Sequence, residues 1–360
     1  MAPCAALTPL NTPLSFHGLN RRRSSSGRIF CVGRRLEIGV SDRRGPSRRD
    51  FVRHSASCGA HLVLASAFAT SFTRTAFAAS PQGQVRAEEP WGRVEEIADG
   101  VWVVISTPLA DRDFTTLSNG GIVAGRDGVL AVEGFASVAG ARWVGDVAEE
   151  LTGRRPTHVA LSHYHGDHSV GQSGYRSRAG ELRVLATEET HRLLELEGQE
   201  RLLPNLVITE TDRPTEIDLG DRVVTLTARE GHTSSDVTVE ITEPRVIWCG
   251  DLVWNGLFPN YRDARPTRLI RHVRQVLSDP DAVYVPGHGD AANLAELGPY
   301  VDLLEDVGQA ATRAVEAGVP HVEAAREYSV PTTLGEWAMF NPLYYEVAFR
   351  AWEQDLRSGG

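Results

Sequence analysis

Residues 161–171, Leu-Ser-His-Tyr-His-Gly-Asp-His-Ser-Val-Gly, hold four side chains of the kinds that bind metal ions. His163, His165, Asp167 and His168 fall within six residues, and burial in a core gives no reason to gather such polar groups. In a loop, His163 and His165 can converge on one ion while Asp167 and His168 face a second. Imidazole and carboxylate suit zinc and also iron, manganese or nickel, so these residues alone do not decide the metal.

Three more candidate ligands come later in the chain, each beside a glycine. They are His232 in Gly-His-Thr, Asp251 in Gly-Asp and His288 in Gly-His-Gly. Each follows a predicted strand, and the glycines let the backbone approach a neighbour closely. Because ligands at strand ends along one edge can share a site, we expect all seven side chains to meet.

The elements that must position these residues form two β-rich halves. Strands are predicted at 100–105, 121–124, 129–132, 157–161 and 183–186, and again at 223–228, 237–241, 246–249 and 282–286. Helices are predicted from the cap Ser137 to about 151, from 187 to 198, at 266–277, and over 291–357 with breaks at Pro320 and Pro331. Two such halves predict an α+β fold, an αβ/βα sandwich of two mixed sheets with helices outside. One domain is expected over 85–300, with 301–360 as its helical extension.

The four motifs, in this order over roughly residues 95–290, resemble the metallo-β-lactamase superfamily. The resemblance implies that His163, His165 and His232 hold one metal ion. It implies that Asp167, His168 and His288 hold the other, and that Asp251 bridges the two. The expected cofactor is a pair of divalent ions, zinc before iron or manganese.

The resemblance also implies a reaction. Two cations a few ångströms apart lower the pKa of a shared water toward about 7 and polarise a carbonyl oxygen. Asp167 is the expected catalytic residue, which orients the attacking hydroxide and accepts its proton. The expected substrate is a small molecule with an ester, thioester, lactone or amide bond. The chain has no lysine, which excludes a lysine Schiff base or nucleophile, and it has no Gly-x-Ser-x-Gly elbow.

Several residues bear on which member of the superfamily this is. Asp251 stands where true β-lactamases usually have Cys or Ser, and a bridging Asp is similar to glyoxalase II, lactonases and periplasmic quinoprotein-relay zinc metallohydrolases. Glu133-Gly-Phe replaces the usual acid-Thr-Gly, so no role is assigned to Glu133. A β-lactamase, a mononuclear iron persulfide dioxygenase and a non-catalytic metal-binding protein remain alternatives. Cys249 is expected to be a buried, inert thiol.

Substrate contacts are predicted from aromatic residues near the motifs. The loop after Asp251 carries Trp254, Phe258 and Tyr261, which can line an apolar pocket. Phe114 precedes the first predicted hairpin and is expected on a flap. Ordinary packing is the competing interpretation of all four.

The first 79 residues are expected to be targeting sequence. They carry 12 Arg against 3 acidic residues, and Ser-Arg-Arg-Asp-Phe-Val-Arg at 47–53 resembles a twin-arginine export signal. A mild apolar stretch at 60–72 and Ala-Phe-Ala at 76–78 complete a signal peptide over 47–79. Residues 1–46 are a misplaced start or a transit peptide. The sequence thus predicts passage through the twin-arginine translocase to the periplasm, or alternatively to a thylakoid lumen, with no membrane anchor after cleavage.

Charge restricts the partners. The chain has a net charge of −10 although its first 79 residues are strongly basic, so the remainder is markedly acidic. An acidic surface repels phosphate backbones, which excludes nucleic acid as the expected partner.

Overall fold

The computed structural model describes residues 83–106, 113–176, 182–199, 204–208 and 214–359. The predictions for the leader segments 1–46 and 47–79 lie outside the described residues. Within the described part of the chain, no helix is both long and apolar enough to cross a membrane.

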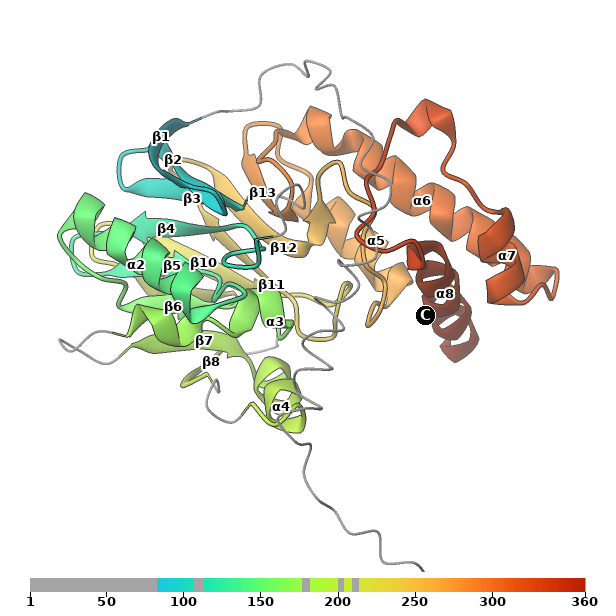
Figure 1. Cartoon of the computed structure of the whole chain (residues 1–360), viewed down its shortest axis with the longest axis horizontal. Helices are drawn as coiled ribbons and strands as arrows, with labels where there is room; N and C mark the ends of the chain where they lie inside the picture. The colour runs from blue at the N-terminus through green and yellow to red at the C-terminus, as the bar shows by residue number, and fades with distance from the viewer. Residues whose placement is uncertain (1–82, 107–112, 177–181, 200–203, 209–213, 360) are drawn as a thin grey trace, which may run out of the picture. The chain divides into compact units, whose positions relative to one another are not determined.

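Eight strands form the first sheet, in the order in which they occur along the chain (Figure 1). The first five pair antiparallel and the last three join in parallel. They are β1 (Gln84–Glu89), β2 (Gly92–Ala98), β3 (Val101–Ser106), β4 (Gly120–Ala124), β5 (Val129–Val132), β6 (His158–Ala160), β7 (Arg183–Thr187) and β8 (Leu206–Ile208).

Five strands form the second sheet, in the order β13-β12-β11-β10-β9. All its pairs are antiparallel except β12 with β13. The strands are β9 (Thr215–Asp218), β10 (Val223–Ala228), β11 (Val237–Ile241), β12 (Val246–Trp254) and β13 (Val283–His288).

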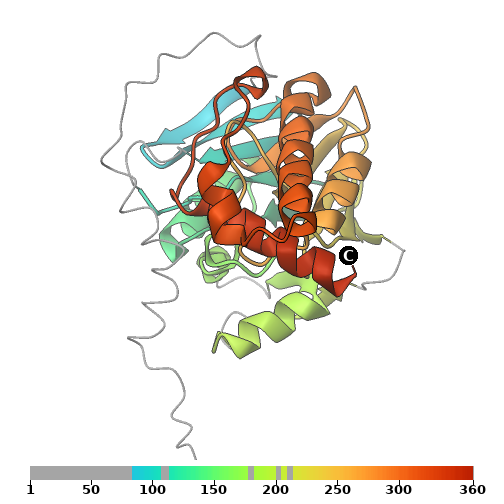
Figure 2. The ribbon, with the colours of Figure 1, turned by 90° about the vertical axis from the view of Figure 1, so that its right-hand side faces the viewer.

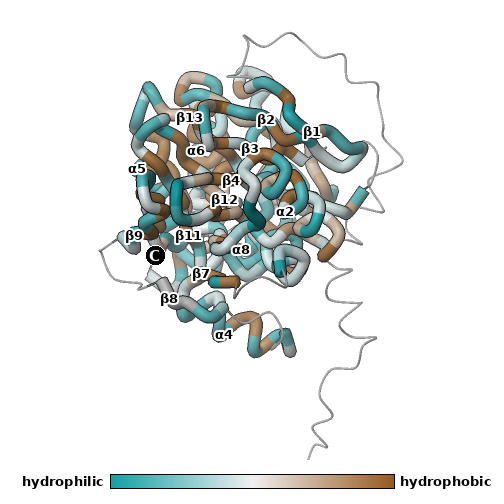
Figure 3. The backbone as a smooth tube through the Cα atoms, turned by 90° about the vertical axis from the view of Figure 1, so that its left-hand side faces the viewer, coloured by the Kyte–Doolittle hydropathy of each residue, from teal (hydrophilic) through white to brown (hydrophobic). Residues whose placement is uncertain are grey.

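The two sheets pack face to face because strand side chains alternate between two buried faces. In β3, Val101, Val103 and Ile105 belong to the core between the sheets, together with residues of β10 to β12. Trp248 of β12 crosses this core and donates a hydrogen bond from Nε1 to the carbonyl oxygen of Gly120, at 2.8 Å. In the hydropathy view, the brown segments gather toward the centre and teal prevails at the periphery (Figure 3).

Helix α2 (Val138–Thr152) covers the outer face of the first sheet. Its N-cap is Ser137, whose side chain accepts a hydrogen bond from the Gly140 amide, and it ends at Gly153 in the left-handed conformation. Ala141, Val144 and Ala148 of α2 pack with Trp102, Val104 and Ile122 of the sheet. Three shorter helices follow strands of the first sheet: α3 (Gly166–Ser169) and η2 (Gln172–Tyr175) come after β6, and α4 (Glu188–Leu196) comes after β7.

The outer face of the second sheet is covered by α5 (Pro266–Val276), α6 (Leu294–Glu316) and α8 (Tyr344–Ser358), as Figure 2 shows. Leu269 and Val273 of α5, Leu304 of α6 and Phe349 and Trp352 of α8 share one apolar cluster with residues of β12. Helix α7 (His321–Glu327) and the short η4 (Thr332–Leu334) connect α6 to α8.

The αβ/βα sandwich predicted from the sequence is confirmed. Each predicted strand lies within two residues of an observed one, apart from β12, which continues five residues past the predicted end at Cys249. The sequence reading missed β1, β2, β8 and β9. Strands β1 and β9 lie at sheet edges, are exposed or half-buried, and hold only Val85, Ala87 and Ile217 as apolar residues, which is too few for an apolar strand signal.

Candidate metal centre

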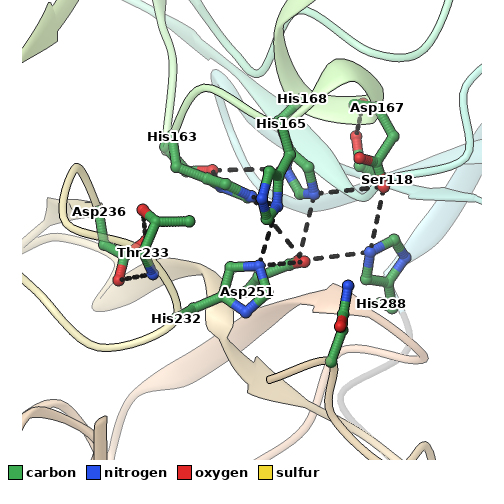
Figure 4. Close-up of polar contacts among 12 residues, drawn as sticks. Ser118, His163, His165, Asp167, His168, His232, Thr233, Asp236, Asp251 and His288 are labelled. Atoms are coloured by element: carbon green, nitrogen blue, oxygen red, sulfur yellow. Dashed lines mark hydrogen bonds and ion pairs between the residues drawn. The ribbon is translucent and has the colours of Figure 1, made fainter. Parts of the chain in front are cut away.

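The seven candidate ligands come together at one end of the sandwich (Figure 4). His163 and His165 lie between β6 and α3, and Asp167 and His168 lie in α3. His232 lies between β10 and β11. Two details of the sequence prediction are corrected: Asp251 lies within β12 rather than after it, and His288 is the last residue of β13. The pairing of β12 with β13 is irregular around Gly250, and this irregularity accompanies the inward position of Asp251.

The first cluster consists of His163, His165, His232 and Asp251, all buried. The Nδ1 atom of His165 lies 3.0 Å from Nε2 of His163 and 3.1 Å from Nε2 of His232. Oδ2 of Asp251 lies 3.3 Å from Nε2 of His232 and 4.0 Å from Nε2 of His163. These four atoms therefore surround one small space.

The second cluster consists of Asp167, His168 and His288. Oδ2 of Asp167 lies 3.6 Å from Nε2 of His168 and 3.4 Å from Nε2 of His288. The other carboxylate oxygen of Asp251, Oδ1, lies 3.2 Å from Nε2 of His168 and 3.3 Å from Nε2 of His288. Asp251 thus offers one oxygen to each cluster.

These clusters fit divalent cations. Four ligand atoms at about 2.1 Å from a tetrahedral cation lie about 3.4 Å from one another, which is close to most of the separations above. Among the described residues, the buried atoms Nε2 of His168 and Oδ1 of Asp251 have no hydrogen-bond partner. Buried polar atoms without partners cost free energy, and a cation between them supplies the missing partner.

Burial and neighbouring charges give imidazoles of the two clusters different protonation states. Burial lowers the pKa of His163 well below its usual value and that of His232 to about 4, so both imidazoles are neutral at pH 7. In the second cluster burial also disfavours the imidazolium, but Asp251 and Asp167 together outweigh it and raise the pKa of His288 to about 9. Metal binding at pH 7 therefore releases no proton from His163 or His232, whereas it releases one from His288.

Glu133 orients the second cluster. One of its carboxylate oxygens accepts a hydrogen bond from Nδ1 of His168 at 3.1 Å, and the other accepts one from the Ser162 amide at 3.2 Å. This arrangement leaves Nε2 of His168 free to face the cation site. Glu133 has a positive φ of 77° and Tyr175 donates a hydrogen bond to its carbonyl oxygen at 3.0 Å. The sequence reading assigned Glu133 no role because its Gly-Phe neighbours depart from the usual motif.

Asp263 orients the first cluster, and the sequence reading missed it. Its Oδ2 lies 3.0 Å from Nε2 of His165 and accepts a hydrogen bond from it. Because the ring proton is then on Nε2, the lone pair of Nδ1 is free to bind a metal ion. Burial raises the pKa of Asp263, but His165, Arg262 and Tyr164 together outweigh it and lower that pKa to about 2. Asp263 is 98 residues from His165 in sequence, and no spacing rule connects the two.

Gly287 shows why a glycine precedes the last ligand. A Cβ atom at this position would overlap Oδ1 of Asp251 and crowd the Asp251 amide. The side chain of Asn119 fastens the same turn, because its Nδ2 donates to the carbonyl oxygens of Pro286, at 2.9 Å, and Gly289, at 2.6 Å. The turn that carries His288 is therefore held by both sheets.

Comparison with known proteins agrees with this geometry. Residues 134–288, which contain all seven candidate ligands, match the family model of the metallo-beta-lactamase superfamily. The similarity to this superfamily is confined to these 155 residues, less than half of the chain.

The individual proteins that the chain resembles are distant in sequence. The chain is 26% identical over 197 residues to a hydroxyacylglutathione hydrolase of Acidiphilium cryptum (strain JF-5), covering 54% of this chain and 74% of the relative. It is 25% identical over 236 residues to the 2,4-dinitroanisole O-demethylase subunit alpha of Nocardioides sp. (strain JS1661), covering 64% and 68%. A metallo-beta-lactamase from Pontibacter korlensis shares the fold, with a TM-score of 0.50 and 18% identity over 60% of this chain and 99% of that one.

A cavity of about 410 Å³ opens onto the candidate metal centre. Its floor includes His165, Asp167, Asp251 and His288, and Trp254 forms part of its wall. The Trp254 ring lies 4.3 Å from the His288 ring between centroids, and Phe340 lies 5.5 Å from each of them. Phe340, in the segment between η4 and α8, and the cavity residues of α8 were not predicted, because nothing in their local sequence indicates that they face the motifs.

The other three aromatic candidates do not line this cavity. Phe258 and Tyr261 are 0% and 1% exposed and belong to the core beneath the C-terminal helices, so packing explains them. Phe114 is partly exposed and is not among the residues around the cavity. Cys249 is buried in the same core as Phe258, and burial raises the pKa of its thiol, as expected for an inert cysteine.

Proposed function

We propose that the protein is a hydrolase that holds two zinc ions and hydrolyses an ester, thioester, lactone or amide bond. The observation that carries the proposal is the pair of ligand clusters that share the two oxygens of Asp251. When bound, two such ions activate water and polarise a carbonyl. The relative named hydroxyacylglutathione hydrolase supports the reaction class.

Asp167 is the residue that moves the proton in this proposal. Its side chain is 17% exposed and borders the cavity, whereas those of His163 and His168 are 1% and 0% exposed. The neighbouring imidazoles outweigh burial and hold the pKa of Asp167 at about 2, so its carboxylate is ionised at neutral pH. It can therefore orient an incoming water and accept its proton.

Two sequence-level alternatives are less well supported. A mononuclear iron dioxygenase needs only one ligand cluster, whereas this chain has a complete second one with its own orienting carboxylate, Glu133. A β-lactamase is compatible with the fold, and no feature of the cavity favours it over the broader hydrolase.

Metal content and turnover test the proposal together. We expect two equivalents of zinc per chain by elemental analysis and turnover of at least one substrate in a panel of thioesters, esters, lactones and nitrocefin. Asp167→Ala and His165→Ala are each expected to reduce kcat/KM by at least about 100-fold, in the range found when a group acting in the transition state is removed. One equivalent of iron with no hydrolysis would contradict the proposal, and so would full activity in either variant.

We further propose export by the twin-arginine translocase to the periplasm. The proposal rests on the Ser-Arg-Arg-Asp-Phe pattern and the apolar stretch after it. Replacement of Arg48 and Arg49 by Lys is expected to retain the precursor in the cytoplasmic fraction. Unchanged periplasmic recovery would refute this route.

A further inference from the structure

The cavity above the candidate metal centre has two kinds of wall. Next to His288 the wall is aromatic, with Trp254 and Phe340. Another part of the wall comes from α8 and the residue before it, through Leu343, Glu346, Val347 and Arg350. Leu343 and Val347 are four residues apart, as are Glu346 and Arg350, so the four side chains lie on one side of the helix.

The apolar part of this helix face is exposed to the cavity. Leu343 is 53% exposed and is one of six large hydrophobic side chains found exposed in the described part of the chain. Leu343 and Val347 together give a hydrophobic strip beside the aromatic wall, and an exposed apolar strip inside a cavity is typical of a ligand contact.

Arg350 lies about one turn after Val347 on α8 and also borders the cavity. Among the described residues, it forms neither a hydrogen bond nor an ion pair within 4.0 Å, although the rest of the protein is rich in acidic groups. Arg357 on the same helix differs, because it pairs with Glu353 and lies in the last turn, where a cation complements the helix dipole. No intramolecular role therefore accounts for Arg350.

Glu346 disfavours a ligand that carries more than one negative charge. It lies in the first turn of α8, where an acidic side chain is favourable. It also borders the cavity about one turn before Arg350, so it repels a second negative charge on a ligand. Leu343 and Arg350 are seven residues apart, which is roughly 10 Å along a helix.

We propose that the substrate is a monoanion: an ester or thioester whose apolar chain lies along Leu343 and Val347 and ends in a carboxylate bound by Arg350. The inference rests on the proposed hydrolase function, because it needs the reacting carbonyl at the metal end of the cavity. The guanidinium offers a planar pair of donors that matches a carboxylate.

Two matched compounds test the charge preference by kinetics. The substrates are the p-nitrophenyl ester of octanoic acid and the p-nitrophenyl monoester of suberic acid, which adds only a terminal carboxylate. We expect kcat/KM to be about tenfold higher for the suberic monoester, mainly through KM, as one charge-assisted contact provides. Arg350→Gln is expected to remove this ratio, Arg350→Glu to invert it, and the control Arg357→Gln to preserve it.

Binding provides a readout that does not depend on turnover. Isothermal titration of the zinc-loaded protein with octanoate and with suberate is expected to show about tenfold tighter binding of suberate, and equal binding in Arg350→Gln. If both esters are hydrolysed equally and both acids bind equally, the carboxylate inference is wrong while the hydrolase function stands. If suberate binds preferentially through Arg350 but no compound is hydrolysed, the ligand class stands and the hydrolase function fails.

Discussion

At the scale of single residues, the metal centre depends on side chains that never touch a metal ion. Asp263 and Glu133 each accept a hydrogen bond from the far nitrogen of a ligand imidazole, of His165 and His168 respectively. Such partners select the tautomer and aim the ring. The aromatic ring of Trp254 adds a third constraint by packing against His288.

We expect Asp263→Asn to weaken zinc binding about 10- to 100-fold, the range found for lost partners of metal-bound histidines. An amide can present either a donor or an acceptor to His165 and no longer stabilises one tautomer. Competition with a chromophoric chelator measures the affinity. Asp263→Glu keeps the carboxylate and should recover part of the zinc affinity. Unchanged affinity in Asp263→Asn would contradict the role of Asp263 in orienting His165.

Zinc binding at neutral pH is expected to release protons. The pKa of His288 is raised to about 9, because Asp251 and Asp167 outweigh the effect of burial, so the metal-free imidazole is protonated at pH 7. A metal ion needs the neutral imidazole, so the apparent affinity should rise with pH until about 9. Titration calorimetry in buffers of different ionisation enthalpy measures the released protons, and buffer-independent heats would contradict this expectation.

At the scale of elements, strand ends and the turns after them set the positions of the ligands. The parallel pairing of β12 with β13 brings Asp251 and His288 to the same end of the second sheet. Asn119, just before β4 of the first sheet, fastens the turn that follows β13. The metal centre is therefore a junction of both sheets.

Gly287→Ala tests how tightly this junction is built. The added methyl group would overlap Asp251, so we expect the loss of the second metal equivalent and a lower free energy of unfolding, by about 1–3 kcal/mol. Gly298→Ala is the matched control, because a Cβ there meets no atom within 4 Å and a helical glycine replaced by alanine gains about 0.5–1 kcal/mol. Metal analysis and urea unfolding are applied to both variants. Equal metal content and equal free energies of unfolding would refute the close approach of Gly287 to Asp251.

At the scale of the whole described molecule, three apolar cores hold the layers together, one between the sheets and one beneath each helical layer. The metal centre adds a polar core at one end, with buried Asp251 among five imidazoles. Because metal ions bind the folded state and leave these groups partnered, they should stabilise it.

Chelation is therefore expected to lower the melting temperature. Free zinc at 100 times its dissociation constant stabilises the folded state by about 2.7 kcal/mol per site, and chelation removes that contribution. Differential scanning calorimetry with and without a chelator measures the shift, and readdition of zinc should reverse it. A melting temperature unaffected by the chelator would show that the two clusters do not hold metal ions in solution.

The sequence by itself determined the sandwich and the residues of both ligand clusters. Continuous apolar runs, such as those of β3 and β12, specify strands buried on both faces, and the motif residues lie at or just after the ends of predicted strands. These are local signals, carried by neighbours in the chain. The exposed strands β1 and β9 lack such a signal, which is why they were missed.

Only the tertiary structure decided what surrounds the ligands. It brought Asp263 to His165 and Glu133 to His168, and it placed Phe340 and Arg350 beside the cavity while it buried Phe258 and Tyr261 in the core. These relations join residues that are far apart in the chain, through the packing of α8 and the loop after β12. No local pattern encodes such contacts, because they depend on how whole layers pack against one another.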